Sequence, residues 1–389
     1  MTAVHTQHPD VAVIGAGVIG LAAAWEATRA GLSVAVLDRS RPGAGTTGVA
    51  AGMLAPVAEA AFGERALLDL NLASAALYPD WVGELREAAG RDPGYRRCGS
   101  LLVARDNDQA VALERERAFR AVQGLAVEPI LPSQARRREP GLAPAIRSAL
   151  HIPGDHAIDP RALVAALVAA IERAGGEVRS QAQVTGVTMS GDRISGVKLA
   201  GDETVSAGHV VAATGWSGGE LEGLDPRARV PLRPVKGQLL HLRDPAGPGL
   251  LSCVLRSEDA YLVPRGDGRY VLGATMEEKG ADTTVTAGAA FELLREAVEL
   301  VPGVTELEVE AMQAGLRPAT PDNGPAIGPA SVDGLSWATG HYRHGVLLAP
   351  ITARAAIAGI TGADVPETAT PFTPARFVAR GVVTPGVAA

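Results

Sequence analysis

Hydrophobic positions near the N-terminus predict two buried strands with a helix between them. Val11–Ile14 and Val34–Leu37 are continuous apolar runs, which is typical of strands covered on both faces. Residues 18–30 between them carry a helical pattern, and Gly31 follows at the position where helices commonly end. The order strand, helix, strand predicts a βαβ unit with parallel strands.

Later segments alternate between helical and strand-like patterns. Apolar residues recur at spacings of three, four and seven over residues 64–89, which predicts a helix. Another helix is expected from residue 161 to 174, after Asp159 as N-cap and Pro160 at the first helical position. Further helices are predicted at residues 109–123, 291–300 and 346–360, and strands at 100–104, 209–213, 306–316 and near Ala326 and Leu335.

Two groups of short strands are predicted in the middle of the chain. Residues 177–180, 183–188, 193–199 and 203–206 are expected to form a meander. Residues 229–276 follow an antiparallel pattern, in which Gly266-Asp267-Gly268 is a hairpin turn signal. We therefore expect an α/β fold in which insertions split the nucleotide-binding unit and the antiparallel section forms a second domain.

The turn after the first strand carries the spacing G-x-G-x-x-G, at Gly15, Gly17 and Gly20. Gly15 permits a tight turn, Gly17 lets the backbone approach a pyrophosphate, and Gly20 lets helix and strand pack closely. The helix N-terminus adds unpaired N–H groups and a positive dipole end for the phosphates. Asp38 lies roughly 20 residues further on, where a carboxylate accepts hydrogen bonds from an adenosine ribose. Together these features predict a dinucleotide site.

Two further segments favour FAD over NAD as that dinucleotide. Residues 39–56 form a loop of small residues, in which Thr46 and Thr47 offer hydroxyls to phosphate. The strand at 209–213 runs into Thr214 and Gly215, which suggests a second close contact with the nucleotide. FAD is long, so it needs contacts from several chain segments. The expected split Rossmann-like FAD-binding domain comprises residues 1–90, 150–228 and 310–389, and the expected antiparallel β-sheet substrate domain comprises residues 91–149 and 229–309.

Composition and charge narrow the range of functions. The chain has 389 residues, of which 47% are hydrophobic and 20% charged, as in a globular protein. Its net charge of −7 argues against nucleic acid or an anionic membrane as the main partner. Cys98 and Cys253 form neither a disulfide framework nor a metal-ligand spacing, which fits a reducing cytosol. Because no secretory signal and no apolar stretch of about 18 residues is present, we expect a soluble, cytoplasmic protein.

The candidate chemistry lies in the C-terminal half. Arg317 and Arg343 are predicted at a strand end and a helix start, where a planar guanidinium fork suits a carboxylate; surface salt bridging is the alternative. Tyr261 offers a phenol to the same carboxylate or packs in the core. His341 and His344 flank Arg343 without an evident catalytic partner. With no side-chain base in sight, the residues predict an FAD-linked oxidoreductase for an anionic substrate.

Longer motifs carry a family resemblance over nearly the whole chain. The most specific are T-T-G-V-A-A-G-M-L at residues 46–54, A-G-L-R-P-A-T at 314–320 and G-H-Y-R-H-G-V-L-L-A-P at 340–350. The chain resembles the D-amino-acid oxidase family of flavoproteins, and within it the glycine oxidases of the thiamine-biosynthesis type. Asp38 stands where that family usually has Glu.

The resemblance implies FAD that is bound without a covalent link. The related sarcosine oxidases attach FAD through a C-terminal cysteine, and neither Cys98 nor Cys253 lies in that region. Residues implied near the adenosine and the phosphates are Val18, Ile19, Asp38, Arg39, Thr46, Thr47 and Val184. Residues implied near the flavin ring are Ala51, Gly52, Met53, His341, Tyr342, Arg343, His344, Gly345, Val346 and Leu347. The residues implied to contact the substrate are Arg317 and Tyr261 at its carboxylate, Arg343 nearby, and Met276 and Met53 in the pocket above the ring.

The resemblance also implies an activity. Glycine would be deaminated oxidatively to glyoxylate, ammonia and hydrogen peroxide, with hydride transfer to the flavin, oxygen as acceptor and no catalytic side chain. The product would supply the thiazole branch of thiamine biosynthesis, and the protein would be a homotetramer. A D-amino-acid or sarcosine oxidase, a related dehydrogenase, and a flavin-binding redox module without catalysis remain as alternatives.

Overall fold

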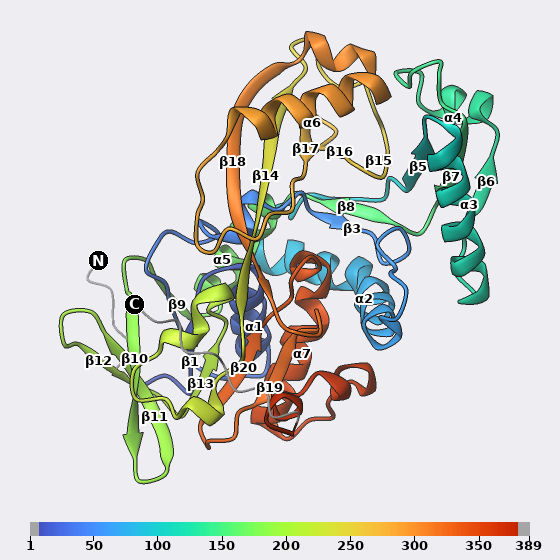
Figure 1. Cartoon of the computed structure of the whole chain (residues 1–389). Helices are drawn as coiled ribbons and strands as arrows, with labels where there is room; N and C mark the ends of the chain where they lie inside the picture. Colours follow the sequence, from blue (N-terminus) through green and yellow to red (C-terminus); the bar gives the residue numbers. More distant parts are fainter. Residues whose placement is uncertain (1–7, 380–389) are drawn as a thin grey trace.

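The computed structural model describes residues 8–379, and a six-stranded sheet lies in its lower half in the view of Figure 1. The strand order is β19-β20-β13-β1-β2-β9. All neighbours are parallel except β19, which pairs antiparallel with β20 at one edge. The strands are β1 (Val11–Ile14), β2 (Val34–Leu37), β9 (Glu177–Arg179), β13 (His209–Ala212), β19 (Ala326–Pro329) and β20 (Leu335–Thr339).

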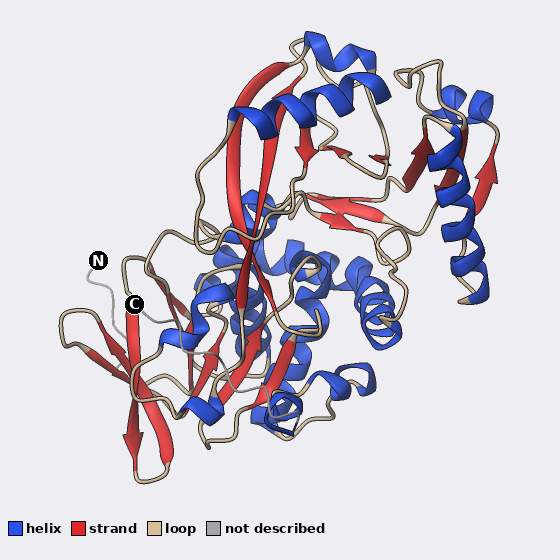
Figure 2. Cartoon of the chain, in the orientation of Figure 1, coloured by secondary structure: helices blue, strands red, loops and turns tan. Residues whose placement is uncertain are grey.

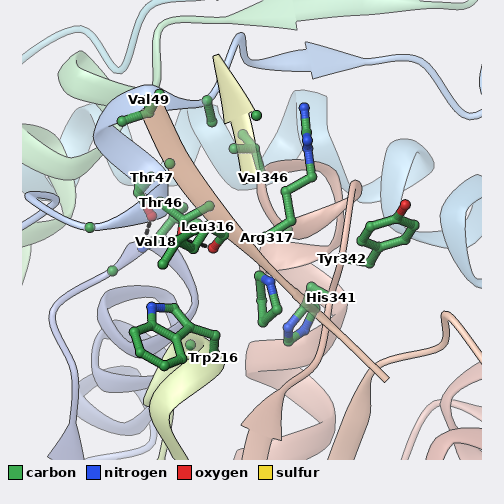
Figure 3. A pocket seen from close by; sticks show the side chains of 18 of the residues that line it. Val18, Thr46, Thr47, Val49, Trp216, Leu316, Arg317, His341, Tyr342 and Val346 are labelled. Carbon is green, nitrogen blue, oxygen red and sulfur yellow. Dashed lines mark hydrogen bonds between the residues drawn. The ribbon is translucent and has the colours of Figure 1, made fainter. Parts of the chain in front are cut away.

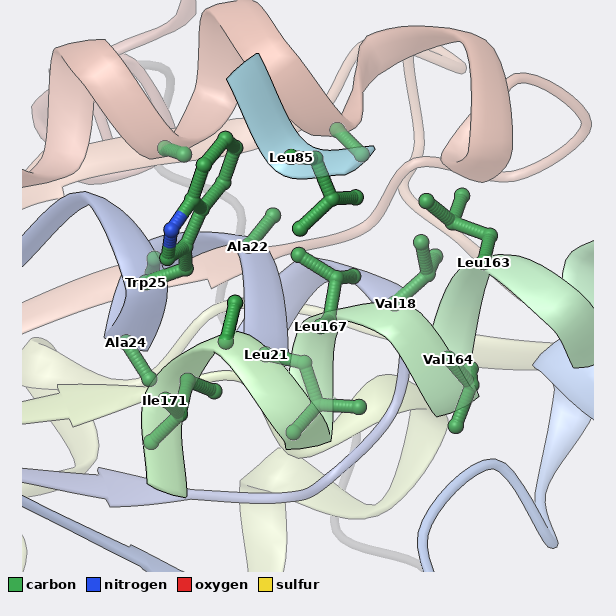
Figure 4. Packing of buried hydrophobic residues seen from close by; sticks show 14 of the residues in the cluster. Val18, Leu21, Ala22, Ala24, Trp25, Leu85, Leu163, Val164, Leu167 and Ile171 are labelled. Atoms are coloured by element: carbon green, nitrogen blue, oxygen red, sulfur yellow. The ribbon is translucent and has the colours of Figure 1, made fainter. Parts of the chain in front are cut away.

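Four helices pack against one another beside this sheet and form the main core: α1 (Val18–Arg29), α2 (Arg65–Ala89), α5 (Pro160–Arg173) and α7 (Gly345–Thr361). Figure 4 shows Leu21 of α1 facing Leu167 and Ile171 of α5. Trp25 meets Trp81 of α2 edge-on, with ring centroids 5.4 Å apart. Because α1 is rich in alanine, its neighbours approach closely, so the helix that follows the glycine turn is held on several sides.

An antiparallel layer forms the upper half of the molecule (Figure 2). Its eight strands follow the order β18-β14-β17-β16-β15-β5-β7-β6, and β15 and β5 are the parallel pair. Helix α6 (Ala287–Leu300) packs on β14 and β17. The strands are β5 (Ser100–Ala104), β6 (Glu128–Ile130), β7 (Ser148–Ile152), β14 (Arg233–Arg243), β15 (Val254–Arg256), β16 (Tyr261–Pro264), β17 (Arg269–Gly273) and β18 (Glu308–Ala319).

The smaller elements complete the chain. A three-stranded sheet contains β3 (Met53–Leu54), β4 (Tyr95–Arg96) and β8 (His156–Ile158), and another contains β10 (Val184–Ser190), β11 (Arg193–Leu199) and β12 (Thr204–Ser206). The remaining α-helices are α3 (Asn107–Val122), α4 (Pro132–Arg138), α6 (Ala287–Leu300) and α8 (Ala375–Ala379). The single-turn helices are η1 (Thr46–Val49), η2 (Gly215–Glu220), η3 (Pro226–Ala228), η4 (Pro302–Glu306) and η5 (Glu367–Phe372).

The expected α/β class, with one parallel and one antiparallel sheet, is confirmed, but two strand assignments were wrong. Residues 177–180 were expected to open the meander, whereas β9 joins the parallel sheet beside β2. Strand β18 was expected to end at residue 316, whereas it continues through Arg317 and Pro318. Proline is tolerated there because β18 is an edge strand, where one side of the backbone has no ladder partner.

The division into two discontinuous domains stays a prediction, and its outermost residues, 1–7 and 380–389, lie outside the described residues. Each sheet does draw on distant parts of the chain: the parallel sheet on residues 11–37, 177–212 and 326–339, the antiparallel sheet on residues 100–152 and 233–319. Among the helices of residues 8–379, none is long and apolar enough to cross a membrane.

The contact between α1 and α5 gives a stability prediction. Leu21 is fully buried in the main core, so Leu21→Ala is expected to lower the free energy of unfolding by about 2–5 kcal/mol. Urea unfolding followed by circular dichroism measures this loss. Val122→Ala is the control, because that side chain is 83% exposed and should change the stability by no more than about 0.5 kcal/mol. Equal effects of the two substitutions would contradict the assignment of this core.

Candidate active site

A cavity of about 950 Å³ is lined by residues from both the six-stranded and the eight-stranded sheet. Its walls come from the glycine turn, the loop after β2, the end of β13, strands β14, β16 and β18, and the segment before α7. Figure 3 shows Val18, Thr46 and Thr47 on one side of it and Arg317 and Tyr342 on the other. The cavity therefore brings together residues that the sequence places more than three hundred positions apart, from Ile14 to Val346.

The glycine turn forms a wall that side chains would obstruct. Gly15 has a φ of +104°, and a Cβ there would lie 2.5 Å from the carbonyl oxygen of Ala213. Gly17 lines the cavity as the N-cap of α1, and because a glycine has no side chain it makes no cap hydrogen bond of its own to the helix start. Gly20 does not line the cavity: a Cβ there would lie 1.9 Å from the Gly15 carbonyl oxygen, so this glycine allows the helix to pack on the turn.

The two predicted threonines lie on the wall and also join parts of the chain. The Val18 amide donates to Oγ1 of Thr47 at 3.1 Å, which leaves the Thr47 hydroxyl hydrogen free to donate to a phosphate. The Thr46 hydroxyl instead donates to the Leu316 carbonyl oxygen at 2.6 Å (Figure 3). Thr46 therefore ties η1 to β18, and of the two only Thr47 fits the expected role of phosphate donor in this arrangement.

Asp38 is fixed on the cavity wall by backbone groups. Its Oδ2 accepts from the Ala16 amide at 2.7 Å, and its Oδ1 accepts from the Ser40 amide at 2.7 Å. Each carboxylate oxygen keeps a second lone pair, so both can still accept a ribose hydroxyl. The shorter Asp side chain thus performs two tasks: it closes the glycine turn and presents acceptors to the cavity.

Most of the other residues predicted from the sequence to lie at the cofactor are also on the cavity wall. Gly52 has a φ of +74°, and a Cβ there would lie 2.0 Å from the carbonyl oxygen of Ile158. Met53 pairs with Ala157 in the small sheet of β3 and β8. Ala51, Val184 and Gly215 also line the cavity, as do Ile19 and Arg39. At Ala51, Gly52 and Gly215 the wall consists of backbone and small side chains.

Arg317 and Tyr261 meet at the end of the cavity away from the glycine turn. The Arg317 guanidinium lies over Gly237, where a Cβ would be 2.4 Å from Nη1, and it donates to the Thr275 carbonyl oxygen at 3.1 Å. Burial raises the pKa of the Tyr261 phenol, and the positive charge of Arg317 acts in the opposite direction as the next largest influence. The phenol therefore stays protonated at neutral pH and can donate a hydrogen bond beside the guanidinium.

Arg343, Tyr342 and Met276 complete this end. The Tyr342 hydroxyl donates to Sδ of Met276 at 3.3 Å, and the Arg343 guanidinium lies 5.4 Å from the centre of the Tyr342 ring. Met276 is 58% exposed, which puts it at the mouth of the cavity. Arg343 lines the cavity, which fits the predicted binding of a carboxylate. Its Nη2 also lies 3.9 Å from Oε2 of Glu64, which fits the alternative of a salt bridge.

The two histidines supply no positive charge at neutral pH. Burial lowers the pKa of His341 to about 3, and Nε2 of that ring lies 2.9 Å from Oγ1 of Thr352 on α7. Burial likewise lowers the pKa of His344 to about 4, and this residue is the N-cap of α7. Gly345 and Val346 line the cavity, whereas Leu347 is buried in the main core and does not.

Sequence reasoning missed two charged residues of the wall, Glu59 and Arg256. Glu59 lies in a turn and Arg256 ends a short strand, so neither belongs to a periodic pattern or a compact motif. Their position depends on pairing between distant strands. No local signal in the sequence would have identified them.

The cavity fits an extended dinucleotide. Its volume lies near the upper end of the range of about 300–1,000 Å³ for cofactor and ligand pockets. Among the described residues, three buried polar atoms on its wall have no hydrogen-bond partner: Thr214 Oγ1, Arg343 Nε and His344 Nε2. Neither Cys98 nor Cys253 lines the cavity, and residues 8–379 contain no cluster of His, Cys, Asp or Glu that could hold a metal ion.

Comparisons with known proteins agree with this geometry. Residues 10–358 match the family described as FAD dependent oxidoreductase. A glycine oxidase of Geobacillus kaustophilus is 34% identical, over 93% of this chain and 94% of its own. A crystal structure of glycine oxidase from the same organism superposes with a TM-score of 0.87, at 32% identity, covering 95% of this chain and 98% of that chain.

Two other relatives have different names. The bifunctional protein ThiO/ThiG of Trichormus variabilis is 36% identical over 88% of this chain, which spans only 51% of that protein. The hydrogen cyanide synthase subunit HcnC of Pseudomonas aeruginosa is 31% identical over 95% of this chain and 96% of its own. The chain therefore spans about half the length of the bifunctional relatives and nearly all of the others.

The contacts of Asp38 generate a prediction for cofactor affinity. Asp38→Asn replaces one acceptor oxygen by an NH₂ group that would face a backbone N–H, so the turn loses a hydrogen bond. We expect the dissociation constant for FAD to rise roughly 5- to 150-fold, as for the loss of about 1–3 kcal/mol. Fluorescence titration of the apoprotein with FAD measures this constant.

Asp10→Asn is the matched control, because that carboxylate accepts from the amide and hydroxyl of Ser33 outside the cavity. Its dissociation constant for FAD should equal that of the unsubstituted protein. Unchanged FAD affinity in Asp38→Asn would show that the carboxylate is not part of the cofactor site.

Proposed function

The chain belongs to the family of FAD-dependent oxidoreductases and is an FAD-dependent amine oxidase, and from this premise we propose that its substrate is glycine. The products would be glyoxylate, ammonia and hydrogen peroxide. The similarity to glycine oxidases over nearly the whole chain supports this proposal. The pair of Arg317 and Tyr261 at the end of the cavity is the observation that carries it.

That pair suits the carboxylate of a small amino acid. A guanidinium offers two parallel N–H donors to a carboxylate, and the protonated phenol offers a third donor beside it. Only a glycine at position 237 permits the Arg317 side chain to lie flat on β14. Met53 and Met276 line the same cavity, and we expect them to restrict the space next to the pair, which would favour a substrate with little or no side chain.

The residues of this site orient the substrate without acting as a base. Binding of the carboxylate by Arg317 and Tyr261 fixes the position of the Cα–H bond. FAD, when bound, supplies the redox chemistry by accepting that hydrogen as a hydride. His341 and His344 are weak bases because burial lowers the pKa of each far below neutrality. The amine therefore has to bind in its neutral form, and the imine product takes up water to give glyoxylate and ammonia.

The overall reaction balances with oxygen as the acceptor. Glycine, water and O₂ yield glyoxylate, ammonia and hydrogen peroxide, because two electrons and two protons pass from the substrate to O₂.

Anaerobic addition of glycine, sarcosine or D-proline should bleach the yellow holoenzyme, with glycine most effective. A lack of bleaching by all three compounds would rule out the proposal.

The second candidate function is a dehydrogenase that passes electrons to an acceptor other than oxygen. The similarity to HcnC favours it, because HcnC is named as a subunit of hydrogen cyanide synthase. Peroxide formed in stoichiometric amounts under air supports an oxidase. Bleaching by glycine without peroxide supports the dehydrogenase.

Two wider proposals rest on relatives. We propose that the product supplies the thiazole branch of thiamine biosynthesis, which the similarity to ThiO/ThiG proteins supports. The resemblance to glycine oxidases also leads us to propose a homotetramer, and the net charge of −7 leads us to propose no nucleic acid or membrane partner. Loss of the gene should then create a requirement for the thiazole precursor, and the mass in solution should be four times that of the chain.

Arg317→Ala tests the role of the guanidinium. We expect KM for glycine to rise and kcat/KM to fall about 10- to 150-fold, as for the loss of about 1.5–3 kcal/mol from a hydrogen bond to a charged group. Peroxide formation at varied glycine concentration measures both constants. Arg243→Ala is the control, since that arginine lies on β14 outside the cavity, paired with Glu310. Near-normal kcat/KM in Arg317→Ala would exclude this carboxylate site.

A further inference from the structure

Glu59 places a carboxylate on the wall of the cavity, at the same end as Arg317. Its side chain is 12% exposed and accepts a hydrogen bond from Nη1 of Arg256. The same Nη1 donates to the Ala58 carbonyl oxygen at 2.9 Å, so Arg256 binds both the backbone and the side chain of this turn. Both residues line the cavity, and the proposed mechanism uses neither.

The Glu59 carboxylate is ionised at neutral pH. Burial raises the pKa of this carboxyl, but neighbouring groups, above all the Arg256 guanidinium, outweigh burial and lower the pKa below its ordinary value. The groups that lower it are, in order of effect, Arg256, His344, Arg343 and Arg317. Of these groups only Arg256 binds Glu59 directly, through its Nη1. The negative charge of Glu59 therefore lies among the arginines of the substrate end.

The turn that carries Glu59 is held on both sides by buried side chains. The Val57 and Ala58 amides donate to the two carboxylate oxygens of Asp155, at 3.1 and 2.9 Å. Arg120 donates to the carbonyl oxygens of the same two residues, at 2.8 Å each. Asp155 and Arg120 are almost completely buried. Glu59 is thus fixed at the cavity, because the two peptide units before it cannot shift without breaking four hydrogen bonds.

The substrate end holds more arginine than a single carboxylate requires. Arg317 with Tyr261 accounts for one carboxylate, which leaves Arg256 and Arg343 on the wall. Arg343 has a buried Nε without a partner among the described residues, and its contact with Glu64 is 3.9 Å long. Arginines in such a position would bind a second anionic group of a substrate. In this protein the Glu59 carboxylate already binds Arg256 in place of such a substrate group.

We propose that Glu59 determines substrate specificity: its carboxylate occupies the place beside Arg256 and Arg343 where a second substrate carboxylate would bind. The enzyme is thereby limited to amino acids with one carboxylate and a small, neutral substituent. This inference rests on the proposed oxidation of glycine at Arg317. Repulsion between like charges is a common way for a site to exclude a competing ligand. It lowers the affinity for the preferred, less charged ligand only slightly.

Binding of two ethers tests the inference without turnover. Methoxyacetate is the ether analogue of sarcosine and has one carboxylate, whereas oxydiacetate is the ether analogue of iminodiacetate and has two. Calorimetric titration of the holoenzyme should give a dissociation constant for oxydiacetate at least about tenfold higher than that for methoxyacetate. Tighter binding of oxydiacetate by the unsubstituted enzyme would overturn the inference before any variant is made.

Glu59→Gln removes the charge and keeps the shape and an acceptor oxygen for Arg256. The ratio of the two dissociation constants should shift by at least about tenfold in favour of oxydiacetate. The ratio of kcat/KM for iminodiacetate to that for sarcosine should shift in the same direction. A substitution that only loosened the structure would weaken both ligands and both substrates together, so an unchanged ratio would refute the role of Glu59.

Glu258→Gln is the matched control, because Glu258 is an exposed acid on the wall of the same cavity. It removes one negative charge as well, and it should leave both ratios within about twofold because exposed charges are screened. An equal shift in both variants would assign the effect to net charge and overturn the inference. Should glycine and sarcosine both fail as substrates of the unsubstituted enzyme, the proposed function fails, while the ether titrations still decide the role of Glu59.

Discussion

The pairing of β14 with β18 is the interaction on which the site depends. The ladder runs from Arg233 opposite Ala319 to Arg243 opposite Glu308, and it joins the antiparallel layer to the cofactor loop. At its lower end Leu316 accepts the Thr46 hydroxyl, and the backbone at Gly315 packs against Val49. The same ladder places Arg317 over Gly237. One pair of strands therefore fixes the distance between the nucleotide end and the substrate end of the cavity.

The two ends of this cavity present different charged and polar groups. The nucleotide end offers backbone amides and Asp38, whose carboxylate is already held by two of those amides. The substrate end offers guanidinium groups, while burial keeps His341 and His344 neutral. Because the imidazoles carry no charge, a bound carboxylate is attracted to arginines alone, whose fork geometry also orients it. Position and electrostatics thus come from the same few side chains.

The sequence predicted the parts of the site that lie within one stretch of chain. The βαβ unit, the glycine turn and Asp38 depend on local spacing, and the Asp159 cap of α5 depends on one residue and the helix it precedes. Strand β9 and the full length of β18 were mispredicted because both are stabilised by pairing with distant strands, which local periodicity does not record. Glu59 and Arg256 were missed for the same reason. Glu59 and Arg256 come together in the cavity only because distant strands pair with one another in the folded protein.

The walls of the cavity extend along the chain from Ile14 to Val346, and this has a consequence for folding during synthesis. Helix α1 is made early, yet its partner α7 comes near the end of the chain, so the apolar surface of α1 stays incompletely covered until residues 345–361 have left the ribosome. Strands β14, β16 and β18, which also line the cavity, are made later than α1 as well. The complete wall of the cofactor site therefore exists only after the segment before α7 has reached its place beside the glycine turn.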